Sequence, residues 1–146
     1  MAVKDPAAWV KNVERLYRSH DAAAVSGLYT ADCNVRAGAH LYGPEEVHRH
    51  PFEWFGSLRD YEITRTFRAA YGDIIVSETV ATYTKKSVDP DAVGDDRYRS
   101  GARYREFGVD IYWVNDEGRI YHKHVLETVE AIDAAGLGDL GEPVHA

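Results

Sequence analysis

Apolar residues recur at helical spacing near the start of the chain and alternate with polar residues over its second half. Four of them predict an amphipathic helix over residues 6–18: Trp9, Val13, Leu16 and Tyr17. Asp5 followed by Pro6 suits its start, because a carboxylate caps the free amides and proline fits the first turn. A second, shorter helix is predicted over residues 22–29.

A third helix is expected from Pro44, and Pro51 should end or kink it at His50, because proline lacks the amide hydrogen that a helix interior uses. Beyond it the period becomes alternating. Strands are expected over residues 34–36, 40–42, 61–69, 74–85, 103–114 and 119–129. Helices first and strands afterwards predict a segregated α+β domain.

The length of 146 residues suits one domain, and 45% hydrophobic content argues against disorder. The domain is predicted to span residues 1–136, followed by a flexible C-terminal tail over residues 137–146. The long charged connection over residues 87–101 is expected to be a mobile loop.

The formal net charge of −7 argues against nucleic acid and against an anionic membrane surface as partners. Cys33 is the single cysteine, so no internal disulfide is possible, and this fits a reducing compartment. Residues 1–20 lack the apolar core of a signal peptide. We therefore expect a cytoplasmic protein.

Three segments, in this order, carry a resemblance to a known family: residues 19–35, 43–47 and 108–120. They resemble the helix-then-strand segment, the start of the third helix and the final hairpin of SnoaL-like proteins, within the nuclear transport factor 2-like superfamily. The resemblance implies a cone: a curved antiparallel sheet wrapped by N-terminal helices around an apolar pocket. Its known enzymes include polyketide cyclases, ketosteroid isomerases, limonene epoxide hydrolases and dehydratases, and they work without cofactors.

Strand alternation places Asp110 and Tyr112 on one face of the strand over residues 103–114. Asp110 matches the ungapped position of the aspartic acid that donates to the substrate oxyanion in the isomerases, which implies that this face is the pocket. Asp110 would act as acid, base or oxyanion donor, assisted by Tyr112. Alternatively, Asp110 simply pairs with Lys123 or Arg36 inside the cone.

Six further residues are predicted to line the pocket: Tyr17, Tyr29, Trp54, Phe55, Lys123 and Glu127. The aromatic ones serve equally well as plain core. Lys123 and Glu127 are favoured as solvated groups near the mouth, because buried lysine and glutamate are rare.

Three positions depart from the relatives. The general base of the isomerases falls on Ala37 and their oxyanion tyrosine on Val13, while an aspartate of the epoxide hydrolases falls on Val125. The resemblance therefore does not carry over either mechanism unchanged.

No metal site is expected. His48 and His50 point apart on a helix, and His122 and His124 lack a third ligand. The acidic run over residues 89–95 begins like a calcium loop but lacks the closing glutamate.

Two hypotheses remain. The first is a cofactor-free enzyme that cyclises, isomerises, dehydrates or hydrates a hydrophobic polyketide-, terpenoid- or steroid-like molecule. The second is a non-catalytic ligand-binding or assembly module. In either case the opposite strand face, with Val109, Ile111 and Trp113, predicts a homodimer.

Overall fold

A computed structural model describes residues 3–89, 91 and 97–132 of the chain. The helices are α1 (Pro6–Arg18), α2 (Ala22–Ser26) and α3 (Pro44–Gly56). The strands are β1 (Tyr29–Ala37), β2 (His40–Tyr42), β3 (Leu58–Tyr71), β4 (Ile74–Lys85), β5 (Arg103–Val114) and β6 (Ile120–Ile132). The predicted tail over residues 137–146 lies outside the described residues, as do residues 90 and 92–96 of the predicted loop.

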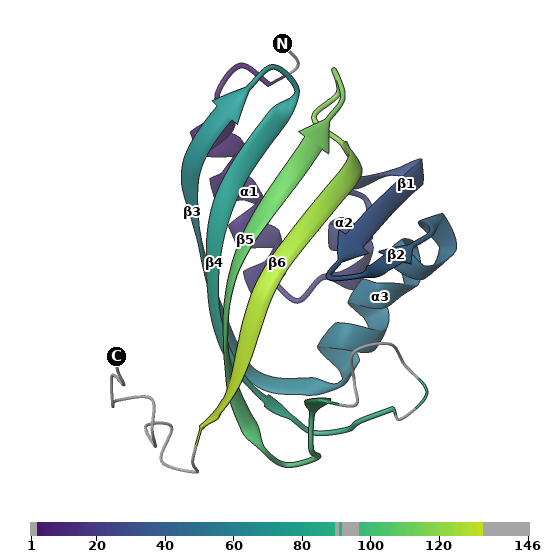
Figure 1. The fold of residues 1–146 in the computed structure, drawn as a ribbon, viewed down its shortest axis with the longest axis vertical. Helices are drawn as coiled ribbons and strands as arrows, with labels where there is room; N and C mark the ends of the chain where they lie inside the picture. The colour runs from purple at the N-terminus through teal and green to yellow at the C-terminus, as the bar shows by residue number, and fades with distance from the viewer. Residues whose placement is uncertain (1–2, 90, 92–96, 133–146) are drawn as a thin grey trace.

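The strands form one open, strongly curved sheet in the order β2-β1-β6-β5-β4-β3 (Figure 1). Neighbouring strands pair antiparallel, except that β1 pairs with β6 in parallel. The register of β3 on β4 shifts between Phe67 and Ala69 and again between Arg59 and Glu62. Because such irregularities bend and twist a strand, they help β3 and β4 to curl. The predicted α+β class with a curved sheet is confirmed.

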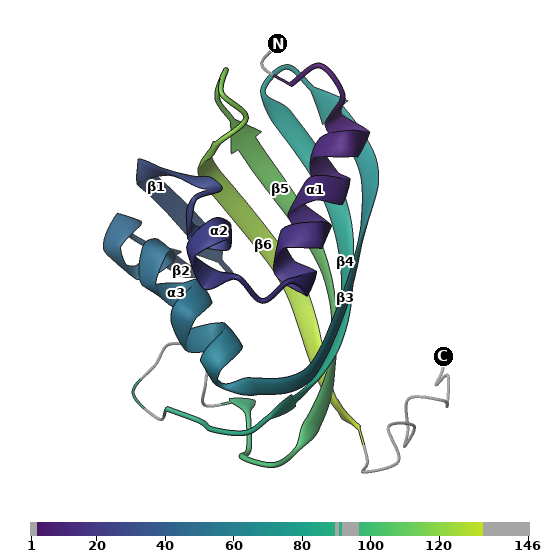
Figure 2. The ribbon, with the colours of Figure 1, turned by 180° about the vertical axis from the view of Figure 1, so that it is seen from behind.

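The helices cover the concave face of the sheet (Figure 2). α1 is tied to it near both ends: the indole nitrogen of Trp9 donates to the carbonyl of Gly118 at 2.9 Å, and Arg18 Nε donates to the carbonyl of Ile63 at 2.8 Å. Val13 is buried, as the helical spacing predicted, and Val10, which was not among the predicted positions, is buried as well. None of the helices among the described residues is long and apolar enough to cross a membrane.

β1, β3 and β6 extend beyond the predicted ranges 34–36, 61–69 and 119–129, and the predicted ends of two helices, at residue 29 and at His50, are wrong. α2 ends at Ser26, and Tyr29 begins β1. The main chain at this point pairs with β6, because the amide of Ile120 donates to the carbonyl of Leu28 at 2.7 Å. α3 runs through Pro51 to Gly56. Proline costs the helix interior one hydrogen bond, and burial of Pro51 and packing of Trp54 against Tyr83 at 5.1 Å favour continuing the helix.

The faces of β5 follow the predicted alternation. Asp110 and Tyr112 are buried on the concave side, whereas Phe107 on the convex side is 39% exposed. The polar face of this strand therefore lies inside the cone.

Candidate functional site

A cavity of about 830 Å³ is lined by residues of the sheet and of the helices α1 and α3. Its lining includes Tyr17, Tyr29, Trp54, Tyr61, Ala37 and Val125. Gly108 lies on the inner face of β5 and brings no side chain, so main chain of the sheet lines the cavity beside it. The volume falls in the range of pockets that hold drug-sized molecules.

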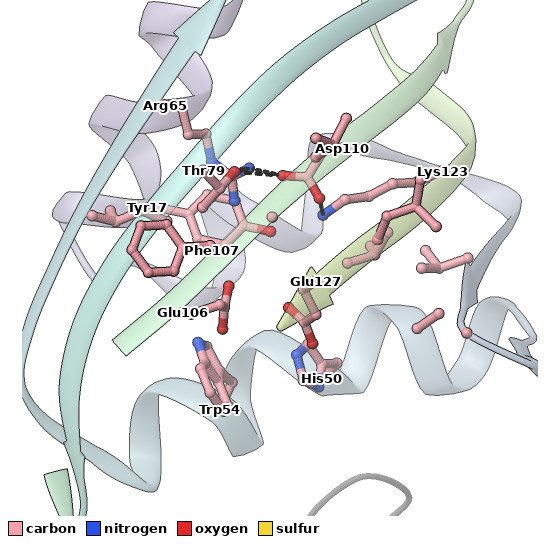
Figure 3. Close-up of a pocket in the computed structure, with 18 of the residues that line it drawn as sticks. Tyr17, His50, Trp54, Arg65, Thr79, Glu106, Phe107, Asp110, Lys123 and Glu127 are labelled. Atoms are coloured by element: carbon pink, nitrogen blue, oxygen red, sulfur yellow. Dashed lines mark hydrogen bonds and ion pairs between the residues drawn. The ribbon is translucent and has the colours of Figure 1, made fainter. Parts of the chain in front are cut away.

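Polar side chains gather in two groups along this cavity (Figure 3). We call the group around Asp110 the inner end; it comprises Arg65, Thr79, Asp110, Tyr112 and Lys123. We call the group that lies towards α3 the outer end; it comprises His50, Trp54, Arg97, Glu106 and Glu127.

At the inner end, one carboxylate oxygen of Asp110 is fully engaged. Its Oδ2 accepts from Arg65 Nη1 at 2.5 Å and from Thr79 Oγ1 at 2.7 Å. The same Nη1 donates to the hydroxyl of Tyr112 at 2.7 Å. The second oxygen, Oδ1, lies 3.9 Å from Lys123 Nζ. Asp110 is therefore held on one side and faces a cation on the other.

The charges of the inner end are stable at neutral pH. Burial by itself would raise the pKa of Asp110, but the Lys123 ammonium and the Arg65 guanidinium outweigh it and lower that pKa. Burial would lower the pKa of Lys123, but the oxygens of Tyr17, Tyr29 and Asp110 raise it instead. Asp110 is thus a carboxylate and not a neutral hydrogen-bond donor.

Two residues of α1 position Arg65. Its main-chain amide donates to Glu14 Oε2 at 2.7 Å, and its guanidinium lies over the ring of Tyr17 at 4.2 Å. Its Nε is buried without a hydrogen-bond partner among the described residues. α1 and β3 therefore present this guanidinium jointly to Asp110.

The outer end contains two carboxyl groups close together. Tyr83 donates its hydroxyl hydrogen to Glu106 Oε1 at 3.3 Å, and Arg97 Nη2 donates to Glu127 Oε1 at 2.7 Å. Burial, then the charges of Glu127 and Asp110, raise the pKa of Glu106 to about 8. Glu106 can accordingly lose or gain a proton near neutral pH.

Aromatic rings surround this carboxyl. Trp54 packs edge-on against Tyr83, with 5.1 Å between the ring centres, and His50 stacks on Trp54, with 5.8 Å between the ring centres. Burial raises the pKa of Tyr83, and it raises that of Tyr98 to about 12. These hydroxyls stay protonated at neutral pH, whereas the Glu106 carboxyl changes its charge near it.

The structure brings together most of the predicted pocket residues. Asp110, Tyr112 and Lys123 meet at the inner end, Glu127 and Trp54 at the outer end, and Tyr17 and Tyr29 line the wall. Phe55 packs on Tyr17 and Tyr61 and does not line the cavity. Lys123 is 7% exposed, so its expected place in solvent near the mouth is wrong; Asp110 beside it offsets the cost of burial.

Sequence reasoning missed Arg65 and Glu106. Of the two partners considered for Asp110, Lys123 lies nearby, but Arg65 makes the direct contact. A signal for Arg65 existed, because it alternates with Ile63 on the apolar face of its strand. Glu106 shares a strand face with Asp110, yet nothing in the pattern showed its proximity to Glu127.

Two of the paired histidines of the sequence, His48 and His122, are not part of the cavity lining. His48 contacts Ser26 at 2.7 Å and the carbonyl of Thr30 at 2.8 Å, and His122 contacts Asn34. Among the described residues there is no group of three or more histidine, cysteine, aspartate or glutamate side chains able to hold a metal ion.

Residues 10–123 match the SnoaL-like domain family, and the chain belongs to that family. The predicted resemblance is confirmed. Ala37 and Val125, where relatives were expected to hold acids, both line the cavity. No curated protein matches the sequence.

Several solved structures share the fold. An epoxide hydrolase/cyclase-like enzyme, SalBIII, with a role in pyran ring formation in the polyether salinomycin, is 18% identical over 86% of this chain and 95% of its own, with a TM-score of 0.65. PrhC from Penicillium brasilianum is 13% identical over 84% and 80%, with a TM-score of 0.64. An NTF2-like protein of unknown function from Exiguobacterium is 12% identical over 82% and 98%, with a TM-score of 0.61. At these identities the likeness establishes the fold alone.

Proposed function

We propose that this protein is a cofactor-free enzyme that transfers protons on a hydrophobic small molecule bearing a carbonyl or hydroxyl group. The observation that carries the proposal is Glu106, a carboxyl with a pKa of about 8 in a cavity walled by aromatic rings. A general acid or base works best when its pKa lies near the working pH. Cyclisation, isomerisation, dehydration and hydration all require such a group.

The two ends of the cavity divide the work in this proposal. Glu106 takes a proton from the substrate or returns it. Asp110 stays ionised and holds Arg65 in place. Tyr112, which is 1% exposed and is not part of the cavity lining, assists by accepting a hydrogen bond from Arg65 Nη1. Aromatic side chains between the two ends, such as Tyr17 and Tyr61, hold an apolar ring by burial and stacking. A polyketide-, terpenoid- or steroid-like substrate fits this arrangement.

The proposal is tested by proton exchange on a simple cyclic ketone. The parent should speed the replacement of the acidic hydrogens of 2-tetralone by deuterium in D2O, followed by proton NMR. Glu106→Gln should lose this rate by about 10²–10⁴-fold, the usual contribution of a general base. Glu62→Gln, at an exposed glutamate of β3, is the matched control and should exchange like the parent. Equal rates for the parent and Glu106→Gln would refute the proposal.

The absence of acids at Ala37 and Val125 favours a second candidate, a non-catalytic ligand-binding or assembly module. It predicts that 2-tetralone binds without any exchange above the solvent rate. In its assembly version, the exposed side chains of Val80, Phe107 and Leu126 on the convex face would lie between two copies. A monomer in light scattering at micromolar concentration would count against that version.

A further inference from the structure

The inner end of the cavity holds more positive charge than negative. Arg65 and Lys123 face the single carboxylate of Asp110, and the three side chains are only 4%, 9% and 5% exposed, respectively. A buried charge without compensation is costly, so such a surplus calls for a counter-charge.

Among the described residues, the other acidic groups of the surrounding elements do not supply that counter-charge. On α1, Glu14 accepts with its Oε2 from the main-chain amide of Arg65 at 2.7 Å, and its Oε1 lies 3.5 Å from Lys11 Nζ. On β5, Glu106 has a pKa raised to about 8, so this carboxyl is mostly protonated at pH 7. On β1 and β5, burial raises the pKa of Tyr29 and raises that of Tyr112 to about 12, so both hydroxyls are neutral at pH 7. Glu127, further along β6, accepts its hydrogen bond from Arg97.

The ammonium group of Lys123 is the one of these two cations that is available to bind a ligand oxygen. Its Nζ lies 3.9 Å from Asp110 Oδ1, which is beyond hydrogen-bonding distance, and 5.5 Å from the centre of the Tyr112 ring. Among the described residues, nothing accepts a hydrogen bond from this ammonium, although it lines the cavity. Arg65, by contrast, donates hydrogen bonds from its Nη1 to Asp110, Thr79 and Tyr112.

We propose that the natural ligand is an organic anion with an apolar ring, whose carboxylate, phenolate or enolate oxygen binds Lys123 at the inner end of the cavity. The anion would complete the charge balance of the Arg65–Asp110–Lys123 group. Its ring would lie against Tyr17 and Tyr29, and its far side would reach towards Glu106. The inference rests on the proposed function in that both place the ligand in the same cavity.

This proposal is tested at pH 7 by isothermal titration calorimetry, which measures the affinities of two probes of equal shape. The anion 2-naphthoate should bind the parent about tenfold or more tighter than the neutral 2-naphthamide, as expected for a hydrogen bond to a charged group. In Lys123→Met the two affinities should converge, while the affinity for 2-naphthamide stays close to that of the parent. Arg99→Met, which removes the charge of an exposed arginine outside the cavity lining, should keep the preference.

Lys123→Met should fold, because it leaves the Arg65–Asp110 pair balanced, and an unchanged circular dichroism spectrum checks this. Equal affinities of the parent for both probes, no binding of either at millimolar concentration, or a preference that survives in Lys123→Met would each overturn the inference. Failure here is distinguishable from failure of the proposed function. A naphthoate preference without exchange of 2-tetralone refutes the enzyme alone, and exchange without the preference refutes the anion site alone.

Discussion

Two carboxyl groups of the cavity, Asp110 and Glu106, lie on the same face of β5 and yet have opposite acid–base behaviour. Burial raises the pKa of both. Asp110 faces two cations, which lower its pKa below the usual value. Glu106 faces Glu127, which raises its pKa further, to about 8. The sign of the neighbouring charge, and not the depth of burial, therefore decides which carboxyl is ionised.

This contrast assigns different tasks to the two ends. Groups whose surroundings push their pKa values apart can act as fixed charge and proton carrier in one site. Asp110 is the fixed charge, and Glu106 is the group that changes its protonation near neutral pH. The following variants test that division, beginning with the largest expected effect.

Asp110→Asn should destabilise the fold by about 3–5 kcal/mol, because it leaves Arg65 and Lys123 buried without an anion. Urea unfolding at pH 7 measures the change. The double variant Asp110→Asn/Lys123→Met is the control and should recover part of the loss, since it removes one of the two uncompensated cations. A single variant within about 1 kcal/mol of the parent would show that the inner end is not a charge-balanced unit.

Glu106→Gln should have the opposite effect on stability, and the effect should depend on pH. The pKa of Glu106 is raised from 4.5 to about 8, so between these values the folded chain binds more protons than the unfolded chain. The stability of the parent therefore falls as the pH rises through this window. Glutamine has no such dependence, so the variant should gain on the order of 1–4 kcal/mol over the parent by pH 8.

Urea unfolding at pH 5, 6.5 and 8 measures this gain. Glu62→Gln, on the exposed side of β3, is the control and should follow the parent at all three values. A constant difference between Glu106→Gln and the parent across the series would contradict the raised pKa.

Arg97→Met should produce the smallest change. Arg97 donates to Glu127 at 2.7 Å and is 42% exposed, so its loss should cost less than about 1 kcal/mol of stability. Glu127 would then repel the Glu106 carboxylate more strongly and raise the pKa of Glu106 above its value in the parent. A carbon-13 NMR titration of the glutamate carboxyls, with Glu106→Gln to assign the signal, measures the shift. Arg99→Met, at a neighbouring exposed arginine, should leave the titration unchanged, and a downward shift in Arg97→Met would contradict the pairing.

Much of the site followed from local pattern. Alternation along β5 put Asp110 and Tyr112 on one face, the resemblance implied that this face is the pocket, and both residues are buried. Pro51 misled the same reasoning, because the local cost of proline in a helix was outweighed by packing that involves β4. Lys123 misled it too, because the general rarity of buried lysine takes no account of an aspartate on the neighbouring strand.

The sequence by itself determined the α1 face, the strand alternation and membership of the SnoaL-like family, since these depend on residues close together in the chain or on matching order. Only the tertiary structure decided the charges of the cavity. Arg65 meets Asp110 across 45 residues of sequence, and Arg97 meets Glu127 across 30. A pKa depends on distance in space and on exclusion of water, and both are set by the curvature of the sheet and the helices packed into it.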